Sequence, residues 1–379
     1  MGPAVYLDYN ATTPVDPRVL EKMLPFFSDY YGNPSSEGHS YGWAASAAVE
    51  AARRQVAEAL GARPANVTFT SGASEGINTA IKGIARAYAG KGRHIITVKT
   101  EHQASLRSCR TLEAEGFRVT YLPVDGDGLI DLDELESALT GETILVNVMW
   151  ANNETGVIHP VSEIAARVRD RGILFMTDAT QAVGKFPVTV AEVDVLVCSG
   201  HKLYGPKGVG VLYLRERVRV PALVDGGGQE HGMRGGTLNV PGIVGLGEAV
   251  EVACSHCGSE ADRLSQLRDN LEQRLAEALP AIRFNGKRAP RLPNTSNTTF
   301  PGDACEYLLM GSLGELAISP GSACASGRSG ASHVLSAMGI PPNEARRSAR
   351  ISLGRPTTEA DTDRAAEIII GAVRALTAT

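Results

Sequence analysis

The sequence has few cysteines, no excess of basic residues and no long apolar run. Its six cysteines among 379 residues lack the spacing of a disulfide framework, which favours a reducing compartment. The net charge is −5, whereas dedicated nucleic-acid-binding proteins are usually basic, so direct DNA or RNA binding is not expected. No apolar run approaches the ~18 residues that a membrane span requires, so no membrane association is expected either.

Targeting signals are also missing from the first residues. The start MGPAVYLDYN lacks the charged region and apolar stretch of a signal peptide. Tyr6 occupies the position at which N-myristoylation requires Ser or Thr. Together these absences predict a cytoplasmic protein.

Short β-rich runs alternate with helical patterns, such as Glu75–Tyr88 and Val161–Arg171, between about residues 65 and 215. Several runs are continuously apolar, as in a sheet covered on both faces, so we predict an α/β fold with a mostly parallel sheet. A short link before the last run makes at least one strand antiparallel. The predicted strands are Val67–Thr70, His94–Val98, Val119–Val124, Ile144–Trp150, Leu174–Thr177, Val193–Cys198 and Val209–Leu214.

The pattern changes after Pro241, where a long helix to about Leu279 precedes short strands and a final helix, Glu359–Leu376. We predict a large domain of residues 15–255 and a smaller α+β domain of residues 1–14 and 256–379, to which the N-terminus returns. The strands predicted for the small domain are Ile282–Asn285, Ser296–Phe300, Leu316–Ile318 and Ala349–Leu353.

Polar segments follow four of the predicted strands, at the sheet edge where parallel sheets bind ligands. Ser71–Ser74 precedes a helix and could hold a phosphate, although alone it is more typical of an ordinary helix cap. Asp178 ends an apolar strand and needs a partner, which could be a cofactor, a helix N-terminus or a cation. Gln181 follows closely enough to reach a cofactor oxygen.

The other two segments supply a lysine and a histidine. Lys202 follows a buried strand, where desolvation would lower its pKa and suit the amine to a Schiff base; the alternative is a surface lysine. His102 could stack on a flat ring and transfer protons, although a single histidine is more often structural. An amine, a carboxylate and an anion site are together what pyridoxal phosphate (PLP) requires.

Cys324 lies in a segment of small residues, about 319–330, that cannot pack a core and is expected to be mobile. Little of an ordinary thiol is ionised at neutral pH, so the cysteine needs a trigger, for which Arg328 and His333 are candidates. Pro320 stiffens the entrance to this segment. An incidental loop cysteine is the alternative, but an exposed thiol without a role is a liability.

These segments resemble the NifS/IscS-type cysteine desulfurases, which are PLP enzymes of fold type I in the class V aminotransferase family. The resemblance covers nearly the whole chain in order. The matching segments are Leu7–Pro14, Gly32–Pro34, Thr70–Glu75, Thr100–His102, Asn152–Gly156, Asp178–Gln181, Ser199–Lys202, Arg234–Thr237, Gly321–Cys324 and Arg350–Arg355.

The resemblance implies catalytic roles for Lys202, His102 and Cys324 and cofactor contacts for Asp178 and Gln181. Lys202 carries PLP through a Schiff base, and His102 stacks on the ring and aids proton transfer. Asp178 pairs with the pyridine nitrogen, and Gln181 contacts the phenolic oxygen. Cys324 receives the sulfur of L-cysteine as a persulfide, and L-alanine is released.

The resemblance also implies binding roles. Asn153, which also contacts the cofactor, and Arg350 hold the substrate carboxylate, to which a guanidinium is suited. Thr237 reaches the phosphate of a neighbouring subunit, so the enzyme is expected to be a homodimer with shared active sites. The residues implied to bind the phosphate are Ala73, Ser74, Ser199 and His201.

The resemblance leaves the sulfur acceptor open among proteins of iron–sulfur assembly, tRNA thiolation and DNA phosphorothioation. Alternative activities are a selenocysteine lyase or a PLP aminotransferase, although an aminotransferase has no use for Cys324. A sulfur-relay protein without catalysis is disfavoured by the lysine, carboxylate and histidine described above. Cys254 and Cys257 form a lone C-x-x-C without a second ligand pair, so structural zinc is not expected; an incidental pair on a helix surface is favoured over an accessory redox or metal role.

Overall fold

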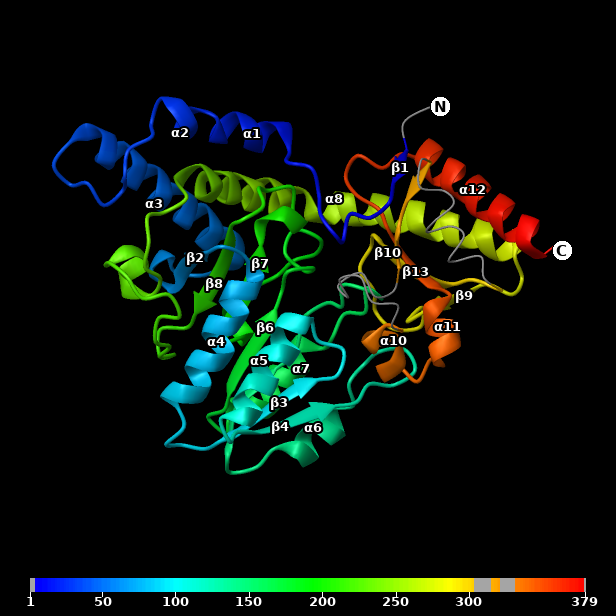
Figure 1. Ribbon diagram of the computed structural model, residues 1–379, viewed down its shortest axis with the longest axis horizontal. Coiled ribbons are helices and arrows are strands. Elements are labelled where there is room, and N and C mark those ends of the chain that lie inside the picture. The colour runs from blue at the N-terminus through cyan, green and yellow to red at the C-terminus, as the bar shows by residue number, and fades with distance from the viewer. Residues whose placement is uncertain (1–3, 303–314, 321–330, 378–379) are drawn as a thin grey trace.

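The computed structural model describes residues 4–302, 315–320 and 331–377, which form a large and a small part (Figure 1). The large part is a seven-stranded sheet of order β2-β8-β7-β6-β5-β3-β4. Only β8 runs antiparallel to its neighbours β2 and β7. The predicted mostly parallel sheet is therefore confirmed. The strands are β2 (Val67–Thr70), β3 (His94–Val98), β4 (Arg118–Leu122), β5 (Thr143–Asn147), β6 (Leu174–Asp178), β7 (Val195–Ser199) and β8 (Gly210–Leu214).

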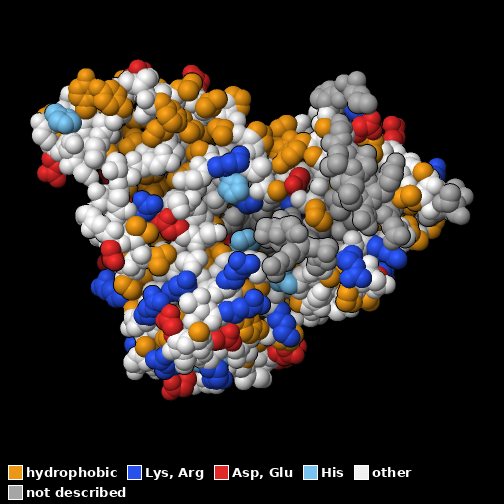
Figure 2. All heavy atoms as spheres, viewed as in Figure 1, with side chains coloured by type: hydrophobic (Ala, Val, Ile, Leu, Met, Phe, Trp, Pro, Cys, Tyr) orange, Lys and Arg blue, Asp and Glu red, His pale blue; other side chains and the backbone are white. Residues whose placement is uncertain are grey.

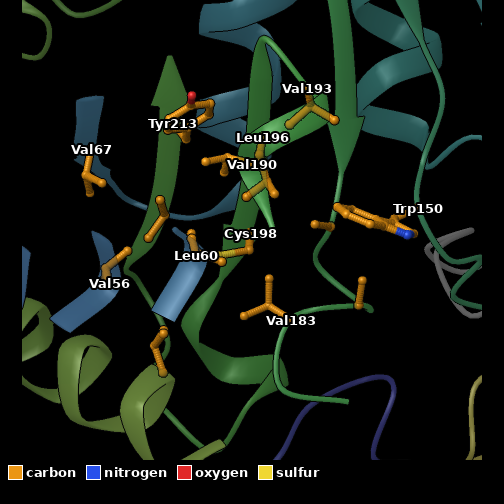
Figure 3. Close-up of a cluster of buried hydrophobic side chains, with 14 of the residues drawn as sticks. Val56, Leu60, Val67, Trp150, Val183, Val190, Val193, Leu196, Cys198 and Tyr213 are labelled. Carbon is orange, nitrogen blue, oxygen red and sulfur yellow. The ribbon is translucent and has the colours of Figure 1, made fainter. Parts of the chain in front are cut away.

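Helices cover both faces of this sheet. Alternate side chains of one strand enter different cores: on β7, Leu196 and Cys198 face one helix layer, and Val195 and Val197 face the other. Figure 3 shows the first core, in which Leu60 approaches Cys198. The helices of this part are α1 (Pro17–Met23), α2 (Pro25–Ser28), α3 (Ser40–Leu60), α4 (Ala73–Ala87), α5 (Gln103–Ala114), α6 (Leu132–Ala138) and α7 (Val161–Arg169).

The small part is built on a four-stranded sheet of order β12-β13-β10-β9, in which every neighbouring pair is antiparallel. The N-terminus returns to this part, as predicted, because β1 pairs with β11. The strands and helices are β1 (Val5–Tyr6), β9 (Arg283–Asn285), β10 (Thr295–Thr299), β11 (Leu316–Ala317), β12 (Ser319–Pro320), β13 (Ser348–Ser352), α10 (His333–Ala337), α11 (Pro342–Arg346) and α12 (Glu359–Thr377).

One long helix, α8 (Val240–Ala278), runs from the large part into the small part (Figure 1). Its first half packs Leu246 and Val250 into the core of the large part. Its second half packs Leu271 and Leu275 into the core of the small part. The predicted domain boundary at residue 255 falls between these halves and stays a prediction. None of the helices in the described ranges has the length and apolar character needed to cross a membrane.

Some predicted element ends are wrong by a few residues. The strand predicted to reach Trp150 leaves the regular ladder at Asn147, although Trp150 N still donates to the carbonyl of Asp178 at 2.9 Å. The helix predicted to end at Arg171 ends at Arg169, because the chain turns through Gly172 at a φ of 67°.

Candidate active site

A cavity of about 540 Å³ lies at the carboxyl ends of the central strands, beside the small part. The surface is hollowed between the two parts, and histidine side chains lie around the hollow (Figure 2). Ten of the twelve predicted site residues line this cavity, so residues far apart in the sequence meet there as expected. They are Ala73, Ser74, His102, Asn153, Asp178, Gln181, Ser199, His201, Lys202 and Arg350.

One end of the cavity is the N-terminus of α4. Gly72 precedes this helix at a φ of 146°, a conformation that L side chains rarely adopt, and a Cβ there would lie 3.5 Å from Ser199 Oγ. Gly210 of β8 packs so tightly that its Cβ would lie 2.7 Å from the Gly72 Cα. The first N–H groups of a helix have no intrahelical acceptors and favour an anion. This end therefore suits a phosphate.

His201 lies at the same end of the cavity. One of its ring nitrogens, Nδ1, lies 3.1 Å from Thr12 Oγ1. Burial, with added repulsion from Lys202 and Lys207, lowers the pKa of His201 to about 4. The imidazole is therefore neutral at pH 7 and offers a phosphate a single N–H rather than a positive charge.

Asp178 ends β6 in the middle of the cavity wall and is 5% exposed. One carboxylate oxygen accepts a hydrogen bond from Thr180 N at 2.9 Å. Since that bond uses Oδ1, Oδ2 is available for a protonated ring nitrogen. A buried carboxylate of this kind suits the pyridine nitrogen of PLP.

His102 is the N-cap of α5, and its Nδ1 accepts a hydrogen bond from Ala104 N at 3.2 Å. The neutral ring must then carry its proton on Nε2. This contact fixes the ring at the cavity wall, where it can stack on a flat cofactor and transfer a proton through Nε2.

Lys202 ends the short 3-10 turn η3 (Gly200–Lys202) that follows β7. Its Nζ donates to the backbone carbonyls of Asn10 at 2.8 Å and of Ala11 at 2.5 Å. The N-terminal segment thus orients the amine inside the cavity, and the alternative of a lysine reaching outward to solvent is excluded.

Arg350, on β13, lies at the opposite end and is 2% exposed. Its Nη1 donates to the carbonyl of Asn153 at 2.9 Å, and its Nη2 donates to Asp8 Oδ1 at 2.7 Å. Its Nε has no partner among the described residues. An incoming carboxylate would find this nitrogen free but would compete with Asp8 for the rest of the guanidinium.

Two predicted residues do not line the cavity. Thr237 is exposed, in the segment between Arg234 and α8. Arg234 ties that segment to Glu75 of α4 at 3.1 Å. The position is compatible with a role toward another subunit, which stays a prediction. Cys324, with its predicted neighbour Arg328, lies outside the described residues.

Sequence reasoning missed several polar residues around the cavity. Asn10 lines it and bonds Thr295 Oγ1 at 2.8 Å. Lys185 donates to Gln181. Glu101 is fully buried, and burial raises its pKa to about 8, with Asp178 adding to the effect. Asn10 and Glu101 lie within the matching segments Leu7–Pro14 and Thr100–His102, and this is the signal that the sequence offers for them.

Glu154 is another missed residue, and it connects the cavity wall to α10. Its carboxyl accepts a hydrogen bond from Ser332 Oγ at 2.5 Å. Burial raises the pKa of Glu154 to about 7, while Ser332, Arg350 and His102 oppose the rise. His333 completes this connection by placing Nε2 2.9 Å from the carbonyl of Glu101.

These residues fit PLP by the chemistry of their donors and acceptors. The cavity offers a primary amine, a buried carboxylate, an imidazole and a helix N-terminus bordered by hydroxyls. These groups match the aldehyde, the ring nitrogen, the ring face and the phosphate of the cofactor. Gly72, at the helix N-terminus, lines the cavity, where a Cβ would lie 3.5 Å from Ser199 Oγ.

Comparisons with known proteins agree with this geometry. The family model described as aminotransferase class-V matches residues 5–365. A protein of Anaeromyxobacter sp. (strain Fw109-5) named cysteine desulfurase IscS is 49% identical over 376 residues, covering 98% of this chain and 93% of its own.

Solved structures are similar as well. A NifS-like protein gives a TM-score of 0.89 at 38% identity, covering 97% of this chain and 98% of its own. The structure of SspA in complex with cysteine gives a TM-score of 0.83 at 41% identity, covering 92% of this chain and 99% of its own. The predicted fold type and enzyme class are thereby confirmed. Because both the family model and the relatives span nearly all of it, the chain belongs to the class-V aminotransferase family, among its PLP-dependent cysteine desulfurases.

Proposed function

We propose that this cysteine desulfurase holds PLP in the cavity at the strand ends, covalently bound to Lys202. The observation that carries the proposal is the meeting of Lys202, Asp178, His102 and the N-terminus of α4 around one cavity. PLP, when bound, supplies an electron sink for the Cα of the substrate. Asp178 keeps the ring nitrogen protonated, and the helix N-terminus holds the phosphate.

Two side chains move protons in this proposal. Lys202, once released by the incoming amino group of L-cysteine, has a free amine that takes the Cα proton. His102 has its Nδ1 occupied by Ala104 N, so its Nε2 donates and accepts protons on the cavity side. Asn153 and Arg350 hold the substrate carboxylate, which fixes the Cα–H bond relative to Lys202.

Cys324 is proposed as the sulfur acceptor. Its thiolate attacks the sulfur of the bound L-cysteine, a new S–S bond forms, and the C–S bond of the substrate breaks. The carbon fragment keeps the electron pair of that bond and becomes L-alanine after protonation. The balance is L-cysteine plus the Cys324 thiol giving L-alanine plus a Cys324 persulfide, with no external oxidant.

A homodimer is the proposed assembly. Large side chains are exposed along α1–α3 of the large part, where a monomer would leave apolar surface in water: Phe27 is 63% exposed, Tyr31 66% and Trp43 60%. Exposed apolar patches of this kind mark association sites. A second copy covering this face would account for the exposure, and Thr237 is proposed to reach its phosphate site.

The sulfur then passes from the Cys324 persulfide to an acceptor protein. Iron–sulfur assembly, tRNA thiolation and DNA phosphorothioation remain candidate destinations for it. The expected cytoplasmic location is compatible with each of them. Capturing proteins that receive radiolabelled sulfur from the loaded enzyme would identify the acceptor.

The test compares Lys202→Ala, Cys324→Ser and the control Cys257→Ser, each reconstituted with PLP and given L-cysteine. The wild type and the control should release alanine and sulfide at equal rates in the presence of a thiol reductant. Lys202→Ala should lose the visible absorption band of the cofactor together with activity. Cys324→Ser should keep the band and lose sulfide release.

The outcomes separate the parts of the proposal. An unchanged spectrum in Lys202→Ala would remove Lys202 from its role. Normal alanine and sulfide production by Cys324→Ser would contradict the persulfide role and favour a lyase of the selenocysteine type. Transamination products in place of alanine would instead indicate an aminotransferase.

A further inference from the structure

A second lysine, the half-buried Lys185, lies beside Lys202 and has no role in the chemistry described so far. Lys185 follows β6 and donates from Nζ to Gln181 Oε1 and, at 3.1 Å, to Asn10 Oδ1. Lys202 bonds the same asparagine through its backbone carbonyl at 2.8 Å. Two lysine side chains therefore meet at one residue on the wall of the active site.

The charge of Lys185 is poorly compensated. Burial lowers the pKa of Lys185 well below its usual value, and Lys202 and Arg350 lower it further, whereas Glu260 raises it. Glu260 is itself paired with Arg355 at 2.8 Å. In the described part of the chain, no carboxylate forms an ion pair with Lys185.

The charged groups that act on Lys185 are Lys202, Arg350 and Glu260. The small cavity on its far side is lined by Tyr9, Tyr204 and Glu260. Burial raises the pKa of both tyrosines, so neither supplies a negative charge. A half-buried lysine without a paired carboxylate costs stability, so its presence points to a function at this site.

Lys185 and Asn10 together turn the Gln181 amide. A carboxamide has one acceptor oxygen and one donor NH₂, and a lysine ammonium can only donate. Gln181 Oε1 must therefore face Lys185. The NH₂ group is left on the other side, where Nε2 donates to the carbonyl of Asn10 at 3.0 Å and Gln181 lines the main cavity.

We propose that Lys185 is a positioning residue for the cofactor: its ammonium turns the Gln181 amide so that NH₂ faces the phenolic oxygen and places a positive charge beside the lysine–cofactor linkage. The inference rests on the proposed function, because it requires PLP bound to Lys202. It assigns Lys185 a task in positioning the Gln181 amide together with Asn10.

Both effects act on the proton of the lysine–cofactor linkage in the same direction. A neighbouring positive charge disfavours the protonated, cationic linkage. The negative charge on the phenolic oxygen stabilises the proton on the linkage. A stronger hydrogen bond from Gln181 to that oxygen disperses this charge and so weakens the hold on the proton. Lys185 therefore lowers the pH at which the linkage loses its proton, and removing its charge should raise that pH.

The experiment follows the visible absorption of the full-length holoenzyme as a function of pH, without substrate. Lys185→Met keeps the apolar stem and removes the charge, so its titration midpoint should rise by about one pH unit relative to wild type. Lys185→Arg, which retains a cation, should lie closer to wild type. Lys99→Met, at an exposed lysine after β3, is the matched control and should not shift.

The readout distinguishes positioning from a merely structural role. A lower Tm of Lys185→Met with an unchanged midpoint would overturn the inference, as would a midpoint that falls. If Lys185→Met does not fold, Lys185→Gln removes the same charge while retaining hydrogen-bonding groups, and the same midpoint decides. A wild-type protein that shows no cofactor band would overturn the proposed function as well, whereas a titrating wild type with an unshifted variant overturns only the role of Lys185.

Discussion

The two walls of the active-site cavity are built in different ways. The wall on the large part consists of residues at the ends of strands of one sheet or in the turns after them, such as Asp178 at the end of β6 and Lys202 in the turn after β7. The opposite wall joins the N-terminal segment to the small part, where Asn10 bonds Thr295 and Arg350 bonds Asp8. In the proposed function, the first wall carries the chemistry on a rigid sheet, and the second holds the substrate and orients the first through interlocking polar contacts.

The largest expected effect is on the sheet wall. Asp178→Asn keeps the shape of the side chain and removes its charge, so the ring nitrogen would no longer be held protonated. We expect kcat to fall by about a hundredfold or more. Steady-state alanine production measures the loss, and the exposed Asp170→Asn serves as the control. A kcat within a few-fold of wild type would contradict the assignment of Asp178.

A smaller effect is expected on the opposite wall. Arg350→Lys loses the planar donor set, and we expect kcat/KM for L-cysteine to fall by about tenfold to a hundredfold. Asp8→Asn leaves the guanidinium in place, held by the carbonyl of Asn153, and should cost only a few-fold. Initial rates over a range of L-cysteine concentrations separate KM from kcat.

These two variants sharpen the comparison between the walls. If Asp8→Asn instead lowers KM, Asp8 competes with the substrate carboxylate for Arg350 in the enzyme without substrate. If Arg350→Lys changes kcat and leaves KM unaltered, Arg350 does not hold the substrate, and the predicted binding role is wrong.

The smallest expected effect concerns stability, beneath the sheet wall. Burial raises the pKa of Glu101 from its ordinary value of 4.5 to about 8, so between these pH values the folded protein keeps a proton that the unfolded chain loses. The free energy of unfolding therefore falls as pH rises through this window. Glu101→Gln stays neutral at every pH, so its Tm should fall less than the Tm of wild type between pH 5 and pH 8. The difference between the two falls should be roughly a few degrees.

Thermal unfolding of the apoprotein between pH 5 and 8 measures this difference. Glu163→Gln, at an exposed position on α7, is the control and should follow wild type across the range. Parallel Tm profiles for wild type and Glu101→Gln would show that Glu101 is already ionised in the folded protein.

The sheet wall was the predictable part of the molecule. The strands Val67–Thr70 and His94–Val98 agree with the prediction residue by residue, because buried parallel strands appear as short apolar runs between turns. Helix α3 was not predicted: its buried face consists largely of alanine and valine, which gives a weak periodic signal. Without a prediction of α3, the exposed aromatic face of Phe27, Tyr31 and Trp43, which we assign to a second copy, was not predicted either.

The sequence by itself determined which chemical groups follow the strands, since an amine, a carboxylate and an imidazole after apolar runs must gather at one sheet edge. Only the tertiary structure decided what surrounds them. Asn10 reaches Lys202 and Lys185, and Asp8 reaches Arg350, through pairings across hundreds of residues that no local pattern encodes. The direction of the Gln181 amide and the charge state of Glu101 depend on burial and on these partners, which exist only once the chain is folded.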